Sequence, residues 1–463
     1  MKRLLFVALM LLITSPLYAA AATFSMTGDY YVEGKWWGNY NLDKYEKATV
    51  RYIDQEINLY PKIQVGNTTL NFRIDLAEVV WGGPEAVDRS DYAANVKGLD
   101  QFRTGDGRIV TNDANINIER AYISHKFNDT YTLDVGLQDG GGWGTIFGNT
   151  VVGQYRIKLT QNTKAGTFLY YYEKPANLAL DNTAEQGDTT TVRNGEEDDT
   201  ENFYLGYINK FGPITVKNLL GYSYGSSADL NLDNRGLFSW AETLALNGDL
   251  GAISFESEFS YKRLRCDLTT AGGFTSDTGN QHWKVYGGYI NVWKDLGTMT
   301  PGFLAAYGSY DENAPTAKGF DFGANFNTTP IFGDQLGLGG GRDLLGMTAY
   351  KLYVNDIKTP AKPLTLSAFA AYIVSNQNSS DVQDAAGVVS YYDGLTAWEA
   401  GIGGAYQITD NLVYNAWTSY GKAQLSSKYK NYAATLADPA DARNLSHDPD
   451  AMYLLANSLT LSF

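Results

Sequence analysis

The stretch Ala451-Met-Tyr-Leu-Leu-Ala-Asn-Ser-Leu-Thr-Leu-Ser-Phe463 closes the sequence and decides the fold. Its alternate positions carry apolar side chains on one face and small or polar side chains on the other. The apolar face holds Tyr453, Leu455, Leu459, Leu461 and Phe463. A period of two over this length indicates a β-strand. Because no element follows Phe463 to cover that face, we expect lipid to cover it.

This strand resembles the C-terminal strand of Gram-negative outer-membrane barrels. In that family the closing aromatic residue is read by the barrel-assembly machinery, so the resemblance implies that Phe463 is an assembly signal and that this machinery is a partner. The same resemblance implies a location in the outer membrane of a Gram-negative bacterium. Outer-membrane lipid and lipopolysaccharide are then further expected partners.

The other end of the chain predicts a secretory signal peptide. Lys2 and Arg3 are basic, the stretch from Leu4 to Ile13 is apolar, and small residues occupy 19–22. The apolar stretch is too short to span a bilayer. We therefore expect residues 1–22 to be removed and residues 23–463 to form a single transmembrane β-barrel domain.

The composition favours the same class of protein. The chain has 48 Gly and 34 Tyr but only 12 Pro and one Cys. Tyrosine and glycine are typical of the interfacial girdles and tight hairpins of membrane barrels. The lone Cys266 excludes an intramolecular disulfide and the paired-cysteine patterns of haem and zinc sites, so no cofactor or metal is expected. The longest charge-free stretch, Pro363 to Ser380, is too polar for a membrane helix, and only a closed barrel then remains for a membrane protein.

Short and long connections alternate along the chain. Short turns are expected near Gly66-Asn67, Asn128-Asp129, Asn162-Thr163, Gly212-Pro213, Gly248-Asp249, Asp295-Leu296, Thr359-Pro360 and Asp410-Asn411. These eight turns and nine long polar loops join eighteen strands, an even number with both ends on the short-turn side. The predicted fold is an all-β, antiparallel up-and-down barrel with short periplasmic turns and long extracellular loops. A β-solenoid or a large secreted sandwich also has many strands, but neither predicts this alternation.

Charged residues fall on one face of several strands, which indicates a water-filled interior. The pore-lining candidates are Asp54, Glu56, Arg73, Asp75, Asp134, Arg156, Lys158, Lys217, Glu256, Glu258, Lys262, Lys351 and Glu399. Basic candidates early in the chain and acidic ones later would place a transverse field across the lumen. The alternative is a set of solvated side chains without a selective role. Glu119 and Arg120 are adjacent and need a bulge if both are to face inward.

The loop 140–153 is rich in glycine and free of charge. The preceding Arg120-Ala121-Tyr122, a short turn and Gly136-x-Gln138 resemble the corresponding hairpin of polyphosphate-porin-like and alginate-export-like barrels. In such porins a constricting loop often follows, so the resemblance implies that role for Trp143, Ile146 and Phe147. A flexible external loop is the alternative.

Other motifs offer little chemistry. The acidic run from Asp181 to Glu201 matches no calcium-loop spacing and is expected to be a solvated loop. His125, His282 and His447 fall at a strand end, a strand start and a loop, so they do not indicate a catalytic group and no enzyme is expected. No phosphate-binding or nucleic-acid-binding motif is present, so no nucleic-acid partner is expected.

The sequence thus predicts an outer-membrane porin, a channel for ion transport and for passive diffusion of small hydrophilic solutes through a polar, charged lumen. One alternative is an export channel for an anionic polysaccharide, which would need a continuous positive track. Another is a non-conducting structural or adhesin barrel. Assembly into a homo-oligomer is compatible with each of these functions.

Overall fold

The computed structural model describes most of the chain beyond residue 20. The described ranges are 21–39, 49–81, 116–140, 142–148, 152–177, 199–225, 234–268, 280–311, 346–360, 363–377, 392–433 and 446–463, with 319–320, 322–323, 326 and 328–332. Residues 1–20 of the expected signal peptide and residues 181–198 of the acidic run lie outside these ranges.

Eighteen strands form one sheet. They are β1 (Thr23–Gly38), β2 (Thr49–Val65), β3 (Thr68–Val80), β4 (Ile116–Lys126), β5 (Tyr131–Gly140), β6 (Val152–Thr163), β7 (Gly166–Asn177), β8 (Asp199–Phe211), β9 (Ile214–Gly225), β10 (Asn234–Asp249), β11 (Ser254–Leu268), β12 (Asn280–Trp293), β13 (Thr300–Gly308), β14 (Met347–Lys358), β15 (Leu364–Ser375), β16 (Thr396–Thr409), β17 (Leu412–Gln424) and β18 (Met452–Ser462). A short helix, α4 (Ser427–Ala433), follows β17.

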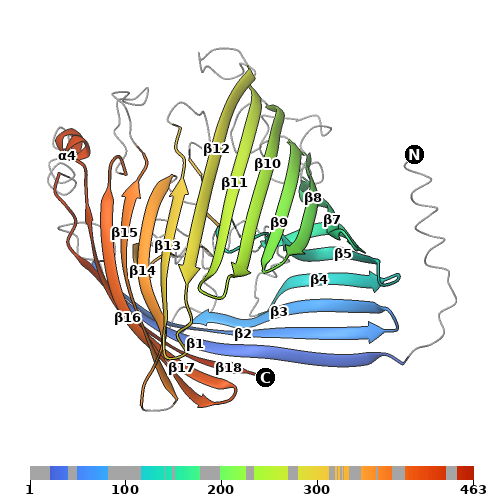
Figure 1. Cartoon of the computed structure of the whole chain (residues 1–463), viewed down its shortest axis with the longest axis horizontal. Helices are drawn as coiled ribbons and strands as arrows, with labels where there is room; N and C mark the ends of the chain where they lie inside the picture. Colours follow the sequence, from blue (N-terminus) through green and yellow to red (C-terminus); the bar gives the residue numbers. More distant parts are fainter. Residues whose placement is uncertain are drawn as a thin grey trace, which may run out of the picture.

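Each strand pairs antiparallel with the next, and β1 pairs with β18, so the sheet closes into a barrel. Figure 1 shows the blue β1 and the red β18 side by side, with α4 at the end of the barrel away from the C-terminus. At the seam, the Gly28 N–H donates to the Phe463 carbonyl at 2.7 Å, and the Phe463 N–H donates to the Gly28 carbonyl at 2.9 Å. The predicted eighteen-stranded barrel is confirmed, and its closure by β1 and β18 leaves no free edge.

All eight predicted short connections are present, and six contain the predicted residues, from β2–β3 at 66–67 to β16–β17 at 410–411. The other two follow the predicted residues: 162–163 and 248–249 end β6 and β10, and the connections lie at 164–165 and 250–253. The expected bulge is also present. Arg73 pairs with Arg120, but the next residue, Ile74, pairs with Ile118, which leaves Glu119 as the extra residue of β4. A bulge allows two adjacent polar side chains to be accommodated in one strand.

The outer surface of the barrel is apolar. Phe24, Trp240, Leu352 and Ile402 are between 61% and 65% exposed, on widely separated strands. Large apolar side chains around a whole barrel cannot be left in water, so this surface is a lipid-facing belt. None of the described helices is long and apolar enough to cross a membrane.

The seam provides a direct test of closure. Val32 of β1 lies opposite Leu459 of β18, and directly opposed residues have Cα separations that suit a disulfide. In a Cys266→Ser background, Val32→Cys with Leu459→Cys should form a disulfide on oxidation. After boiling, this looped chain should migrate faster on a non-reducing gel. Val32→Cys with Leu455→Cys is the control, because Leu455 lies opposite Trp36 instead. Equal cross-linking of both pairs would contradict the register.

Candidate functional site

The candidate site is the inner face of the barrel, where two regions differ in polarity. On β2 to β7, ion pairs join neighbouring strands. On β12 to β18, the inward positions near the long-loop ends are apolar and are covered by parts of residues 319–332, which we call the aromatic segment. Residues 142–148, which we call the glycine segment, lie against β8 to β11.

Arg73 organises the charged wall at β2 and β3. Its Nε donates to Asp75 at 2.8 Å, and its Nη2 donates to Asn58 at 3.1 Å and lies 3.6 Å from a Glu56 oxygen. Asn58 in turn donates to Asp29 of β1 at 2.7 Å. The side chains of Asp75 and Glu56 are 0% and 4% exposed, whereas that of Arg73 is 20% exposed. The guanidinium is therefore the group of this network that faces the lumen most openly.

The wall continues across β4 to β7 in the same manner. Arg156 Nε donates to Glu173 at 2.6 Å, its Nη1 donates to the Asp139 carbonyl at 2.7 Å, and its guanidinium lies 4.7 Å from the centre of the Tyr171 ring. Arg120 forms an ion pair with the carboxylate of Asp139. Each such pair compensates much of the cost of holding a charge away from bulk water.

Lys158 of β6 completes this wall. Its Nζ lies 2.6 Å from an Asp134 oxygen, and the two residues are directly opposed on β6 and β5. The Lys158 side chain is 26% exposed and that of Asp134 is 8% exposed. The wall therefore has more exposed basic groups that lie over more buried carboxylates. The sequence instead predicts basic and acidic residues on separate parts of the lumen.

Sequence reasoning missed several members of this wall. Asp29, Arg120, Asp139 and Glu173 all take part in its hydrogen bonds and ion pairs. Glu173 stands between Tyr172 and Lys174 after a run of three tyrosines, so no alternation in β7 marks it as inward-facing. Arg120 could not be placed because the bulge at Glu119 shifts the register of β4 by one residue.

The glycine segment is held by Glu258 of β11. The backbone N–H and the hydroxyl of Thr145 donate to the same Glu258 oxygen at 2.6 and 2.7 Å. A Cβ at Gly148 would lie 2.7 Å from the other Glu258 oxygen, and Gly144 has a φ of +73° and also contacts this carboxylate. The glycines at these two positions thus let the backbone approach the carboxylate closely.

Two further contacts fix the glycine segment. Lys217 of β9 donates from Nζ to the Gly144 carbonyl at 2.8 Å. The Trp143 ring lies over Gly206 of β8, where a Cβ would be 2.8 Å from the ring. Of the three constriction candidates, Trp143 is partly buried, Ile146 is 45% exposed and Phe147 is fully buried.

Phe147 joins the glycine segment to the aromatic segment. Its ring stacks on Tyr289 at 5.4 Å and on Phe320 at 5.3 Å, and it meets Phe326 edge-on at 5.1 Å. The Gly323 N–H donates to the Phe147 carbonyl at 2.8 Å. Two loops that are far apart in the sequence therefore form one packed unit inside the barrel.

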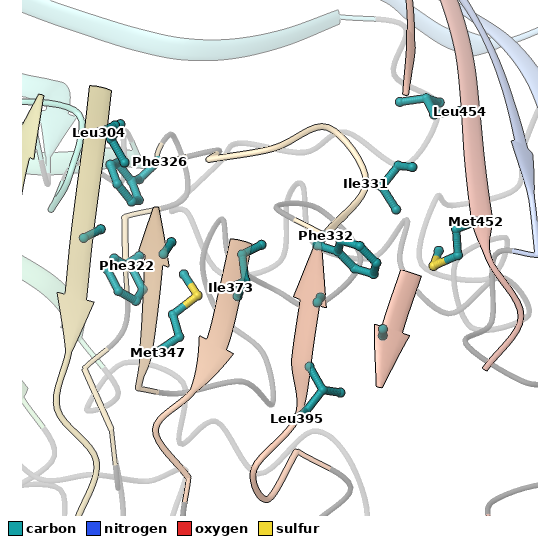
Figure 2. Close-up of a cluster of buried hydrophobic side chains, with 14 of the residues drawn as sticks. Leu304, Phe322, Phe326, Ile331, Phe332, Met347, Ile373, Leu395, Met452 and Leu454 are labelled. Atoms are coloured by element: carbon teal, nitrogen blue, oxygen red, sulfur yellow. The ribbon is translucent and has the colours of Figure 1, made fainter. Parts of the chain in front are cut away.

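The aromatic segment packs on the apolar half of the inner wall. Figure 2 shows Phe326 beside Leu304, Phe322 beside Met347, and Phe332 between the side chains of Ile373 and Met452. This covering explains the inward Tyr289 of β12, whereas the buried Trp283 and Val285 pack with Leu264 in a separate cluster. A strand covered on both sides shows no polar face in its sequence.

Glu399 of β16 holds the aromatic segment. Its two oxygens accept the Ile331 N–H at 3.0 and 3.2 Å, and one of them also accepts the Phe332 N–H at 3.1 Å. The residue is 1% exposed. Glu399 and Glu258 thus have the same structural role, in which a buried inward carboxylate binds backbone donors of an inward-folded loop.

The other pore-lining candidates also lie on inward positions. Glu256 accepts from Asn291 at 3.5 Å, and Lys351 lies 4.9 Å from the centre of the Phe369 ring. Asp54 is partly buried on β2, and Lys262 is exposed on β11. Whether any of these residues contacts a passing solute stays a prediction.

The three histidines lie on separate parts of the barrel. His125 contacts the Thr68 hydroxyl at 2.8 Å at the short-turn end, His282 is on the outer surface of β12, and His447 contacts Ser446 in the connection before β18. No group of three or more His, Cys, Asp or Glu that could hold a metal is found among the described residues.

Comparison with known proteins gives a structural likeness only. No protein-family model and no curated protein matches the sequence. OccAB3 of Acinetobacter baumannii superposes with a TM-score of 0.50 and 11% identity over 95% of this chain and 100% of that chain. OccAB1 of the same organism gives a TM-score of 0.50 and 11% identity over 95% and 97% of the two chains. Together with the closed sheet and its apolar belt, this likeness gives the chain the fold of an eighteen-stranded outer-membrane β-barrel.

Proposed function

We propose that this chain is an outer-membrane porin through which small hydrophilic solutes or ions diffuse passively. The observation that carries the proposal is that one part of the inner wall is covered by loops and another part is charged and open. Two inward-folded loops are anchored on β8 to β18, while the facing wall on β2 to β7 has partly exposed Arg73, Arg120 and Lys158. Solutes would pass between this wall and the glycine segment, where charged groups can replace part of a solute's hydration.

The pairing of charges argues against export of an anionic polysaccharide. Such a polymer needs a continuous positive track, whereas Arg73, Arg156 and Lys158 each have an acidic partner on the same wall. A non-conducting adhesin barrel would have no need for buried carboxylates that bind loops inside the lumen. Passive diffusion therefore accounts for more of the interior than either alternative, and no catalytic role is proposed.

Single-channel recording tests this function. The purified protein, first verified as a heat-modifiable barrel, should form stable open channels in a planar bilayer, with a conductance that rises with salt concentration. Detergent extract from cells without the protein is the control. A folded barrel that inserts but does not conduct would contradict the proposal.

Two further roles are proposed on the resemblance alone. Phe463 would be an assembly signal for the barrel-assembly machinery, in addition to its hydrogen bonds with Gly28. The lipid-facing belt would contact outer-membrane lipid, and a homo-oligomer could form through part of that belt.

A further inference from the structure

The outer surface carries one group of basic side chains that the porin function does not use. Arg263 and Arg265 lie on the same face of β11 as the exposed Phe259, and His282 and Lys284 lie on the same face of β12 as the exposed Tyr286. We call these four residues, Arg263, Arg265, His282 and Lys284, the basic quartet. All four therefore project from the barrel toward its surroundings rather than into its lumen.

The register brings basic side chains together, including the like charges of Arg263 and Lys284. Arg263 lies directly opposite Lys284, and Arg265 lies directly opposite His282. Directly opposed like charges on neighbouring strands destabilise a sheet, the more so on a surface of low polarity. Among the described residues, no carboxylate is within ion-pair distance of Arg263 or Lys284. Glu242, on the same outer face of β10, interacts with Asn218 at 3.4 Å instead. An external anion would relieve this repulsion.

The quartet borders a depression that suits a lipid. Its volume is about 660 Å³, and it is lined by Tyr222, Trp240, Arg263, Leu264, Arg265 and His282. The Tyr222 and Trp240 rings lie 5.0 Å apart at 55° to each other. Basic groups beside exposed aromatic rings match a ligand that has both an anionic head and apolar chains.

The height of the quartet matches the lipid headgroups. Arg263 lies about 23 Å above Ser254, the first residue of β11, from a rise of about 3.3 Å per residue and a strand tilt of about 40°. The apolar band of membrane barrels is about 25 Å tall. Because β11 begins at a short turn and ends at a long loop, the quartet lies at the long-loop edge of the band.

We propose that the basic quartet binds the phosphate of an outer-leaflet lipid, with Trp240 and Tyr222 packing against the rest of that molecule. This site rests on the proposed outer-membrane location, but it does not depend on conduction. Arg263 and Lys284 donate charge-assisted hydrogen bonds to the phosphate oxygens, and the lipid chains lie along the apolar belt below.

The test uses the full-length barrel in neutral detergent, with diphosphoryl lipid A and the same lipid without phosphates as probes. Native mass spectrometry would measure how much of each lipid the protein retains. We expect a preference of about tenfold or more for the phosphorylated lipid, as charge-assisted hydrogen bonds provide. Arg263→Gln with Lys284→Gln should abolish this preference. Arg51→Gln is the matched control, because Arg51 is also exposed, lying 4.9 Å from the Trp36 ring near a long-loop end.

Three outcomes would overturn the site. One is equal retention of both lipids by the wild type. Another is an unchanged preference for the phosphorylated lipid in the double variant, and this result would mean that the chain's own carboxylates neutralise the quartet. The third is complete displacement of lipid A by millimolar inorganic phosphate, which would indicate a free-phosphate site. Trp240→Ala should weaken retention of both lipids while it keeps the preference. Conductance of the double variant should equal that of the wild type, so failure of this site would leave the porin function untouched.

Discussion

Replacing Glu258 by Ala should increase single-channel conductance, because the glycine segment loses its anchor. The Glu258 carboxylate accepts two hydrogen bonds from Thr145, and hydrogen bonds to charged groups contribute about 1.5 to 3 kcal/mol each. Without them the Thr145 N–H is left without its partner, and the segment can leave the inner wall. Recordings in a planar bilayer should show a larger and noisier open level than that of the wild type.

Glu256→Ala is the matched control for this experiment. Glu256 and Glu258 occupy neighbouring inward positions of β11, but the described contacts of Glu256 are with β12 rather than with the glycine segment. Both variants lose one acidic group. If the two glutamates act only through their charge, each variant should lose the same amount of cation preference. The permeability ratio in a salt gradient measures this preference. A conductance increase that is equal in both variants would refute the anchoring role.

Phe147→Ala should loosen both inward-folded loops at once. The Phe147 side chain is fully buried among Tyr289, Phe320, Phe322 and Phe326, and truncation of a buried phenylalanine costs about 3 to 5 kcal/mol. The barrel itself keeps its hydrogen-bonded sheet, so heat-modifiable migration on gels should persist. We expect higher conductance and faster cleavage of the inner loops by protease added to reconstituted vesicles.

Ile146→Ala gives the control for that variant. Ile146 is the adjacent residue and is 45% exposed, so its truncation creates no cavity and should leave the protease sensitivity of the loops unchanged. If Phe147→Ala kept the wild-type conductance, the aromatic contacts between the loops would have no part in setting the width of the passage.

The barrel was predictable from the sequence because strand period and turn chemistry are local properties. The alternation in residues 451–463 depends only on neighbouring residues, and so does a turn such as Gly66-Asn67. The adjacent charges of Glu119 and Arg120 indicated that a bulge is needed if both face inward, but they did not determine the register of that strand.

The interior was less predictable because it depends on pairs that are far apart in the chain. Glu258 and Glu399 were correctly placed inside, but no local pattern indicates that each binds the backbone of a distant loop. The aromatic segment has no strand or helix period, so its phenylalanines gave no signal that they cover β12 to β18. Long-range packing of irregular segments is the part of a fold that sequence patterns express least.

The seam has a consequence for the order of assembly. Pairing of Asp29 with Ser462 joins residues from opposite ends of the chain, so it is among the most non-local contacts the fold contains. Closing so long a loop costs chain entropy and slows folding. Until β18 arrives, β1 and β17 each expose a row of unpaired backbone groups that can pair with other chains. The barrel is therefore most prone to aggregation just before its last strand is added. The free edge of β1 must be kept from pairing with other chains for the longest time.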